Sequence, residues 1–229
     1  MADKPKILIV AAHPDDEILG CGATIKKYSQ EFEIHTLILG AGKDSRKSGK
    51  SASENFEQEK LALKKEAATA NQAIGCENVV FADFPDNRFD SVALLDIVKK
   101  IDEVKESVKP QKIFTHFKGD LNIDHKITYD AVLTATRPMQ DETVKEIYAF
   151  EILSSTEWNY PLSFCPNFFV DVTSQIQDKV EAMQAYKSEL RDYPHPRSVE
   201  AIFANAKYWA FRTGIDGYAE AFEIVRMVK

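Results

Sequence analysis

Short apolar segments alternate with longer segments of helical periodicity from residue 6 to residue 137, and this alternation constrains the fold most strongly. The apolar segments have the length and composition of buried strands, and apolar residues recur at helical spacing between them. Strands that alternate with helices build a mostly parallel sheet with helices on both faces and right-handed crossovers. The sequence therefore predicts an α/β fold of this kind.

Turn-forming residues mark the ends of the predicted elements. Gly75 and Pro110 each follow a helix, and Ser91 is expected to cap the helix that ends before Pro110. A further helix starts near residue 19, and residues 41–53, rich in Gly, Lys and Ser, are expected to form a mobile loop. We expect the less regular last third to decorate a single domain over residues 1–229. The predicted strands are 6–12, 33–39, 78–84, 112–117, 146–153 and 167–172, and the other predicted helices are 54–74, 91–108, 125–136, 173–192 and 198–212.

Composition excludes several classes of protein. The 229 residues carry a net charge of −7, whereas a duplex-binding protein usually presents a basic face, so nucleic acid is not an expected partner. The three cysteines are far apart and form no C-x-x-C pair, which predicts free thiols in a reducing compartment rather than a disulfide framework or a thiolate zinc site. Neither a long apolar leader nor a membrane span is expected, so we predict a cytoplasmic location.

The end of the first predicted strand carries the most informative residues, His13, Asp15 and Asp16. In open α/β sheets, ligands bind just beyond the carboxyl ends of the strands. A neutral imidazole and a carboxylate are ligands that suit Zn²⁺ or a similar divalent ion. His125 follows the fourth predicted strand, and parallel strands end at one edge of the sheet, so His125 can approach His13. A set of His13, Asp16 and His125 would leave coordination positions open for water and substrate.

Each of these residues also has a structural interpretation. A single histidine at a strand end is usually solvated or hydrogen-bonded, and two aspartates before a helix often cap it and stabilise its dipole. Because all three residue types occur at two strand ends of one sheet edge, the pattern favours a metal-dependent hydrolase.

The segment His-Pro-Asp-Asp-Glu at residues 13–17 resembles the signature of the PIG-L/LmbE family of metal-dependent N-deacetylases. The resemblance extends from residue 6 to residue 225, and residues 120–125, 169–172 and 218–222 support it. It implies a Rossmann-like, LmbE-like fold that binds no nucleotide cofactor. It also implies a small-molecule substrate, an N-acetylglucosamine unit carried on an inositol, a lipid, a small thiol precursor, an antibiotic scaffold or another aglycone. Relatives often assemble as trimers or hexamers, which is compatible with a homo-oligomer, but the sequence itself does not reveal the oligomeric state.

The resemblance further implies that His13, Asp16 and His125 hold zinc, or another divalent metal such as Fe²⁺, and that Asp15 is the general base. This chemistry suits amide hydrolysis, because a metal lowers the pKa of its bound water towards about 7 and polarises the carbonyl oxygen. Asp15 would accept the proton of the attacking water and pass it to the leaving amine.

One position departs from the family pattern. Many members carry a histidine three residues before the second metal-binding histidine, and here that residue is Asn122. An asparagine amide donates a hydrogen bond to an oxyanion but does not transfer a proton near pH 7. Either Asn122 acts as this donor alone, or His195, fixed between two prolines, supplies the acid; a surface histidine in a rigid connector is the alternative. Asp124 is expected either to orient a ligand imidazole or to cap its helix.

Substrate contacts are assigned from loop positions. Arg46, Arg88 and Arg197 are expected near the pocket rim, where they would suit a phosphorylated or nucleotide-linked sugar, although solvated loop charges are the alternative. Trp158 is expected to stack on a sugar ring, or else to lie in the core or in a subunit contact. Other functions that fit the pattern are an amidase acting on a thiol-conjugate or another sugar amide, and a catalytically impaired sugar-binding protein. A nucleotide-binding module is disfavoured, because no complete glycine fingerprint follows the first strand.

Overall fold

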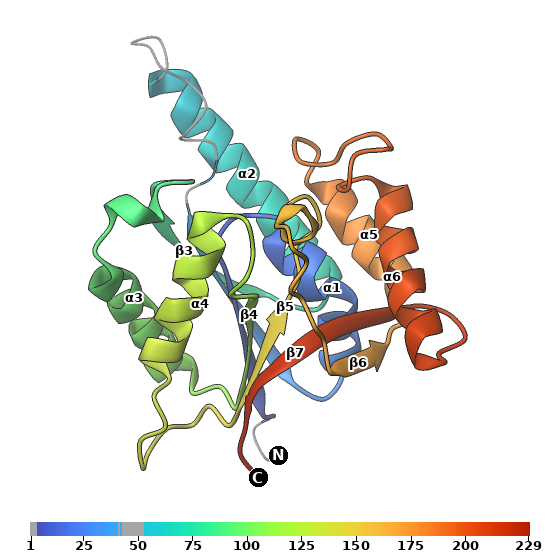
Figure 1. The fold of residues 1–229 in the computed structure, drawn as a ribbon. Helices are drawn as coiled ribbons and strands as arrows, with labels where there is room; N and C mark the ends of the chain where they lie inside the picture. Colours follow the sequence, from blue (N-terminus) through green and yellow to red (C-terminus); the bar gives the residue numbers. More distant parts are fainter. Residues whose placement is uncertain (1–3, 41, 43–52) are drawn as a thin grey trace.

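The computed structural model describes residues 4–40, 42 and 53–229, which form one seven-stranded sheet flanked by helices (Figure 1). No helix in this described part is both long and apolar enough to cross a membrane. The strands are β1 (Lys6–Ala11), β2 (Glu33–Gly40), β3 (Asn78–Phe84), β4 (Lys112–His116), β5 (Glu146–Phe150), β6 (Phe168–Asp171) and β7 (Ala219–Met227). The α-helices are α1 (Asp16–Tyr28), α2 (Ser53–Ala73), α3 (Leu94–Val108), α4 (Ile123–Ala135), α5 (Ile176–Ala185) and α6 (Val199–Thr213), and the 3-10 turns are η2 (Phe89–Ser91) and η3 (Thr156–Trp158).

The sheet has the order β3-β2-β1-β4-β5-β7-β6. The first five of these strands are parallel, and β7 pairs antiparallel with both β5 and β6. β1 is the central one of the five parallel strands. Its Ile9 lies opposite Thr36 of β2 on one side and Phe114 of β4 on the other. The continuous apolar sequence of β1 fits this position, because a central parallel strand is covered on both faces.

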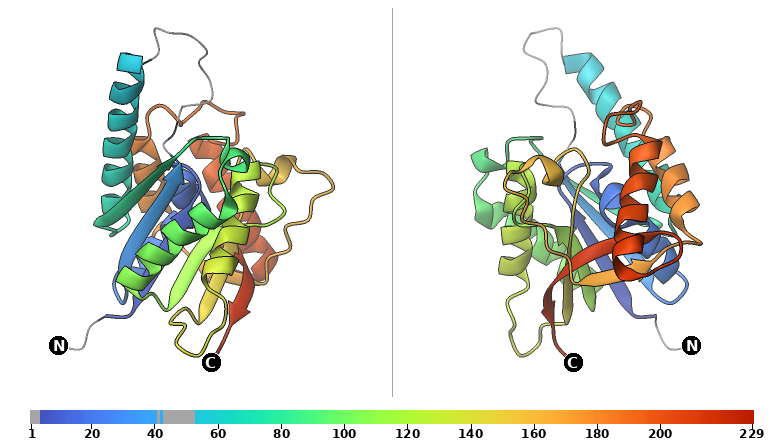
Figure 2. Two further views of the ribbon diagram at one scale, coloured as in Figure 1. Left: turned by 90° about the vertical axis from the view of Figure 1, so that its left-hand side faces the viewer. Right: turned by 45° about the vertical axis from the view of Figure 1, so that its right-hand side comes forward.

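Helices cover both faces of the sheet, as predicted (Figures 1 and 2). Alternate side chains of β1 enter separate cores, since successive residues of a strand point to opposite faces. Leu8 and Val10 pack into the core beneath α3 and α4, whereas Ile7 and Ile9 pack into the core that α1, α2, α5 and α6 cover. Both layers therefore hold β1 rigidly, and the turn that follows it starts from a fixed position.

The strand order reverses at β1. The chain passes from β1 to β2 on one side of β1, and after β3 it crosses to β4 on the other side. The segments that follow β1 and β4 therefore diverge, which opens a crevice beyond the carboxyl ends of these two strands. Residues 12–15 and 117–122 border this crevice.

Two predicted helix boundaries were wrong. Ser91 does not cap the helix predicted over 91–108, because its hydroxyl donates to the Arg88 carbonyl within η2 and α3 begins only at Leu94. The helix predicted over 173–192 ends at Ala185, where Tyr186 leaves the helical conformation and its ring is fully buried. An irregular segment, residues 186–198, follows and reaches the crevice.

The sequence analysis did not predict β7 as a strand. Its first four residues are buried, and it fills the space between β5 and β6 that the strand pattern alone left open. The predicted strand over 146–153 is shorter in the structure, because β5 stops pairing at Phe150 and the chain turns into η3. All three cysteines are free, and Cys21 and Cys76 are buried.

Candidate active site

Three of the predicted site residues meet at one point in the crevice. His13 lies in the turn after β1, Asp16 begins α1, and His125 lies in the first turn of α4. His13 Nδ1 is 3.3 Å from Asp16 Oδ2, His125 Nε2 is 3.4 Å from the same oxygen, and the two ring nitrogens are 3.3 Å apart. The structure thus brings together the side chains predicted as metal ligands.

The spacing of these donor atoms fits a tetrahedral divalent ion. Ligand atoms about 2.0–2.1 Å from a tetrahedral zinc lie about 3.3 Å from one another. The triangle of His13, Asp16 and His125 has sides of this length, and its three atoms lie within 4.8 Å of one another. The second oxygen of Asp16, Oδ1, is buried and has no hydrogen-bond partner among the described residues. An unpaired buried carboxylate oxygen calls for a partner, and a cation is a suitable one.

Carboxylates orient the far side of each ligand ring. His13 Nε2 lies 3.0 Å from Asp124 Oδ2 and 3.4 Å from Asp86 Oδ1, and His125 Nδ1 lies 3.1 Å from Asp120 Oδ1. Such partners fix the orientation of metal-ligating imidazoles and raise their basicity. Asp124 therefore lies where the orienting role was predicted. The cap of α4 is instead Asn122, which accepts from the Asp124 N–H.

The charges around the triangle favour a positive group at its centre. Burial alone would lower the pKa of His125, but Asp16 and Asp120 raise this pKa to about 9. Burial also lowers the pKa of His13, and hydrogen bonds to Asp124 and Asp16 reverse the shift, so that the pKa lies well above its ordinary value. Burial raises the pKa of Asp16, yet the neighbouring histidines bring it well below the usual value. A cation at this point is stabilised in the same way as the protons.

His116, at the end of β4, contacts two members of the triangle, His125 and Asp16. Its ring stacks on His125 with centroids 4.0 Å apart, and its Nε2 accepts the Ala12 N–H at 2.8 Å. Burial, followed by the neighbouring His125, lowers the pKa of His116 well below its ordinary value, so this ring is neutral. The sequence analysis missed His116, although a polar residue at the end of a buried strand gives the same signal as His13.

Asp15 lies beside the triangle in an unusual conformation. It is 1% exposed, with φ 103° in the left-handed region. A non-glycine residue in this region is strained and needs support from its surroundings. Its N–H donates to Glu17 Oε2 at 3.1 Å, and the other oxygen of Glu17 accepts from Asn71 Nδ2 and the Tyr186 hydroxyl. Burial raises the pKa of Asp15 well above its usual value, although Arg197 opposes the shift.

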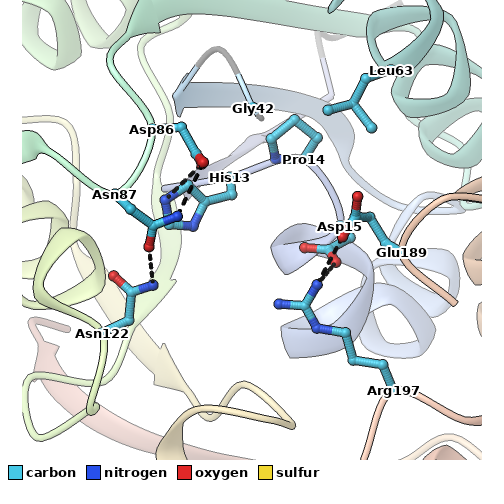
Figure 3. Close-up of a pocket in the computed structure, with 10 residues that line it drawn as sticks. All are labelled: His13, Pro14, Asp15, Gly42, Leu63, Asp86, Asn87, Asn122, Glu189 and Arg197. Carbon is cyan, nitrogen blue, oxygen red and sulfur yellow. Dashed lines mark hydrogen bonds and ion pairs between the residues drawn. The ribbon is translucent and has the colours of Figure 1, made fainter. Parts of the chain in front are cut away.

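A small pocket opens over these groups (Figure 3). Asn122 lies on its wall, where its Nδ2 donates to Asn87 Oδ1 at 3.1 Å. Arg197 lies on the opposite side, and its guanidinium points towards Asp15 (Figure 3). The residues that line the pocket are His13, Pro14, Asp15, Gly42, Leu63, Asp86, Asn87, Asn122, Glu189 and Arg197.

Other predicted site residues lie elsewhere. Arg88 is exposed and Trp158 is 47% exposed, and neither lines the pocket. His195 does not line it either, and its Nδ1 accepts the Arg197 N–H at 3.0 Å. Arg46 lies outside the described residues. The sequence analysis missed Glu189 and Asp86 as lining residues, because nothing in their local pattern separates them from surface carboxylates.

Comparison with known proteins gives these observations a context. The profile of the family described as PIG-L, GlcNAc-PI de-N-acetylase, matches residues 8–136. YaiS of Escherichia coli K12, described as an uncharacterized deacetylase, is 30% identical over 196 residues, which cover 82% of this chain and 94% of that protein.

Solved structures share the fold. N,N'-diacetylchitobiose deacetylase from Pyrococcus horikoshii, in complex with an inhibitor, matches with a TM-score of 0.76 and 18% identity, covering 98% of this chain and 85% of the other. GalB, the 4-carboxy-2-hydroxymuconate hydratase of Pseudomonas putida KT2440, matches with a TM-score of 0.73 and 22% identity, covering 98% of both chains. Identities this low show the fold alone, and the fold serves two different reactions in these two enzymes. The likeness confirms the predicted fold class.

Proposed function

Because the chain belongs to the PIG-L family and is a deacetylase that hydrolyses an amide, we propose that it removes the N-acetyl group from an N-acetylglucosamine-type amino sugar. The family description names a GlcNAc substrate, and the Pyrococcus horikoshii relative in fold acts on an N-acetylated disaccharide. A small, polar pocket with amide and carboxylate groups suits sugar hydroxyls, which both donate and accept hydrogen bonds.

The observation that carries this proposal is the triangle of donor atoms from His13, Asp16 and His125 beside a buried carboxylate. Its sides of 3.3, 3.4 and 3.3 Å fit zinc or a similar divalent ion. When bound, such an ion supplies a water of lowered pKa and a Lewis acid for the carbonyl oxygen. Asp124, Asp86 and Asp120 would hold the two imidazoles in place for it.

We assign the proton transfers to Asp15. Its carboxylate lines the pocket, and burial raises its pKa, which strengthens it as a proton acceptor. The neighbouring Asp16 is unsuited to this task, because its oxygen faces both ligand histidines. Proton uptake by Asp15 during attack and its transfer to the amine would leave a carboxylate, acetate, and a free amino sugar.

Asn122 is proposed as a neutral donor to the oxyanion. Its Oδ1 is occupied as the cap of α4, which leaves the Nδ2 face turned to the pocket side, towards Asn87. A proton-transfer role for His195 stays a prediction, and its place behind Arg197 favours a supporting role instead. Of the side chains predicted to bind substrate, Arg197 lines the pocket, and Arg88 and Trp158 would need a substrate that extends beyond it.

The proposal is tested by metal analysis of the purified protein followed by a screen for acetate and primary amine release. The screen compares free N-acetylglucosamine, its glycosides with neutral aglycones and its nucleotide-linked forms, with Asp16→Asn as the inactive control. We expect about one divalent ion per chain and acetate release from at least one of these sugars. Cleavage of thiol-conjugate amides without release of acetate from any sugar would replace the proposal with the amidase alternative. Sugar binding without hydrolysis would indicate the impaired sugar-binding protein.

A further inference from the structure

One arginine connects the buried Asp15 to a second carboxylate across the pocket wall. Arg197 Nη1 lies 2.8 Å from Asp15 Oδ2 and 3.1 Å from Glu189 Oε2, and Arg197 Nε donates to Ser154 Oγ at 2.8 Å. These four residues come from three segments that are remote in the sequence: the turn after β1, the chain after β5, and residues 186–198. Figure 3 shows Arg197 beside Asp15 and Glu189.

Hydrogen bonds hold the backbone of Arg197 as well as its guanidinium group. The Arg197 N–H donates to His195 Nδ1 at 3.0 Å, and its carbonyl accepts the Arg191 N–H at 3.2 Å. Ser198 then caps α6 through a hydrogen bond from the Ala201 N–H. A planar guanidinium fixed in this way presents its donors in one geometry, which a lysine ammonium does not reproduce.

The Asp15 carboxylate needs such a partner. Glu17 accepts a hydrogen bond from the backbone N–H of Asp15, and the hydrogen bond that holds the Asp15 carboxylate comes from Arg197 instead. Displacement of a catalytic group by about 1 Å costs about 10²-fold in rate. Arg197 is the cation that meets this carboxylate in the described part of the chain.

We propose that Arg197 is a positioning residue that holds the Asp15 carboxylate in its working orientation, and that Glu189 and Ser154 hold Arg197. The role of Asp15 on which this inference rests is part of the proposed function. Glu189 also keeps a counter-charge beside the guanidinium when Asp15 accepts a proton, so the arginine stays in place through the reaction.

The test compares Arg197→Ala, Arg197→Lys and Glu189→Gln with Arg191→Ala. Arg191 is an exposed arginine of the same segment, and its Nη1 bonds to the Ser188 and Leu190 carbonyls. We expect kcat to fall about 10²-fold in Arg197→Ala with KM changed less than about 3-fold and metal content unchanged. The losses in Arg197→Lys and Glu189→Gln should be smaller, and Arg191→Ala should match the parent. Added guanidinium ion should restore part of kcat in Arg197→Ala and none in Asp15→Ala.

A second readout does not depend on activity. The melting temperatures of the metal-loaded parent, Asp15→Asn, Arg197→Gln and the double variant form a thermodynamic cycle. We expect the double variant to depart from additivity by about 2–4 °C, since the pair is partly screened by solvent. Additive shifts, or a rise in KM with kcat unchanged, would overturn the positioning role. Non-additive shifts in a protein that hydrolyses no sugar amide would overturn the proposed function while the contact itself stands.

Discussion

At the scale of the residue, the turn after β1 gives two adjacent aspartates different environments. Asp16 faces His125, His116 and His13, which bring its pKa well below the usual value against the effect of burial. Asp15 points the other way, and burial raises its pKa despite Arg197. Asp15 has the left-handed conformation directly before α1, and Asp16 is the first residue of that helix. The two side chains thus have environments that suit the different roles proposed for them, Asp16 as a metal ligand and Asp15 in proton transfer.

This division predicts opposite results for two conservative substitutions. Asp15→Asn should lower turnover by at least about 10²-fold and leave the metal content unchanged, because the amide has no basic site for the proton. Asp16→Asn should lose most of the metal along with activity. Elemental analysis and acetate release on the same samples measure both effects. Metal loss in Asp15→Asn with metal retained in Asp16→Asn would show that the two roles are reversed.

Two substitutions of Asn122 should separate its effect on activity from its effect on stability. Its Oδ1 caps α4 and its Nδ2 faces the pocket, so Asn122→Asp keeps the cap and removes the donor, whereas Asn122→Ala removes both. Both variants should lose about 10-fold or more in kcat, in the range of other oxyanion donors. Thermal unfolding should show a loss of about 1 kcal/mol for Asn122→Ala alone. Full activity in Asn122→Asp would remove Asn122 from the reaction.

At the scale of the element, the position of α1 depends on close contact with β5. A Cβ added at Gly20 would lie 2.3 Å from the Phe150 ring, which is fully buried. Gly22, on the same helix, has room by comparison, with its nearest neighbour at 3.3 Å. The glycine at position 20 therefore lets the helix that begins with Asp16 lie close against the sheet.

Gly20→Ala should therefore destabilise the fold by about 1–3 kcal/mol, as overpacking of a dense core does. Gly22→Ala is the matched control, because its gain of about 1 kcal/mol in helix propensity offsets a mild crowding. Denaturant unfolding of both variants measures the difference. The pair Gly20→Ala and Phe150→Leu should recover stability, since the smaller side chain makes room; equal stability of the two single variants would contradict the contact.

The elements also show where sequence patterns suffice. The strands β1 to β4 and the helix α2 are predicted to within a few residues. Each strand is a short apolar run, and α2 has a composition rich in helix-forming residues and ends at a glycine. The early end of α5 is not readable in this way, since it depends on the burial of Tyr186 against Glu17. The strand β7 escapes prediction because its two halves differ in burial, and its pairing partners precede it by many residues.

At the scale of the whole molecule, parallel strand topology explains why the meeting of His13 and His125 was predictable. His13 and His125 are 112 positions apart, yet both follow strands that end at one edge of the sheet. The contacts of Arg197 with Asp15 and with Glu189 were not predictable, because residues 186–198 have no regular structure that would place them. Sequence analysis thus locates the side chains that the sheet positions, whereas for Arg197 in the irregular segment it predicted only a place near the pocket, and not which groups the side chain contacts.

The same topology predicts the effect of metal removal. The three proposed ligands belong to two segments that lie beyond the ends of β1 and β4, whereas the two cores beneath the helices are complete without them. A chelator should therefore abolish activity and leave the fold intact. An ion present at about 100 times its dissociation constant contributes about 2.7 kcal/mol, which corresponds to a fall of about 5–10 °C in melting temperature on removal. Added zinc should restore the value in the parent and not in Asp16→Asn. Global unfolding on chelation would instead mean that the ion holds the two sides of the crevice together.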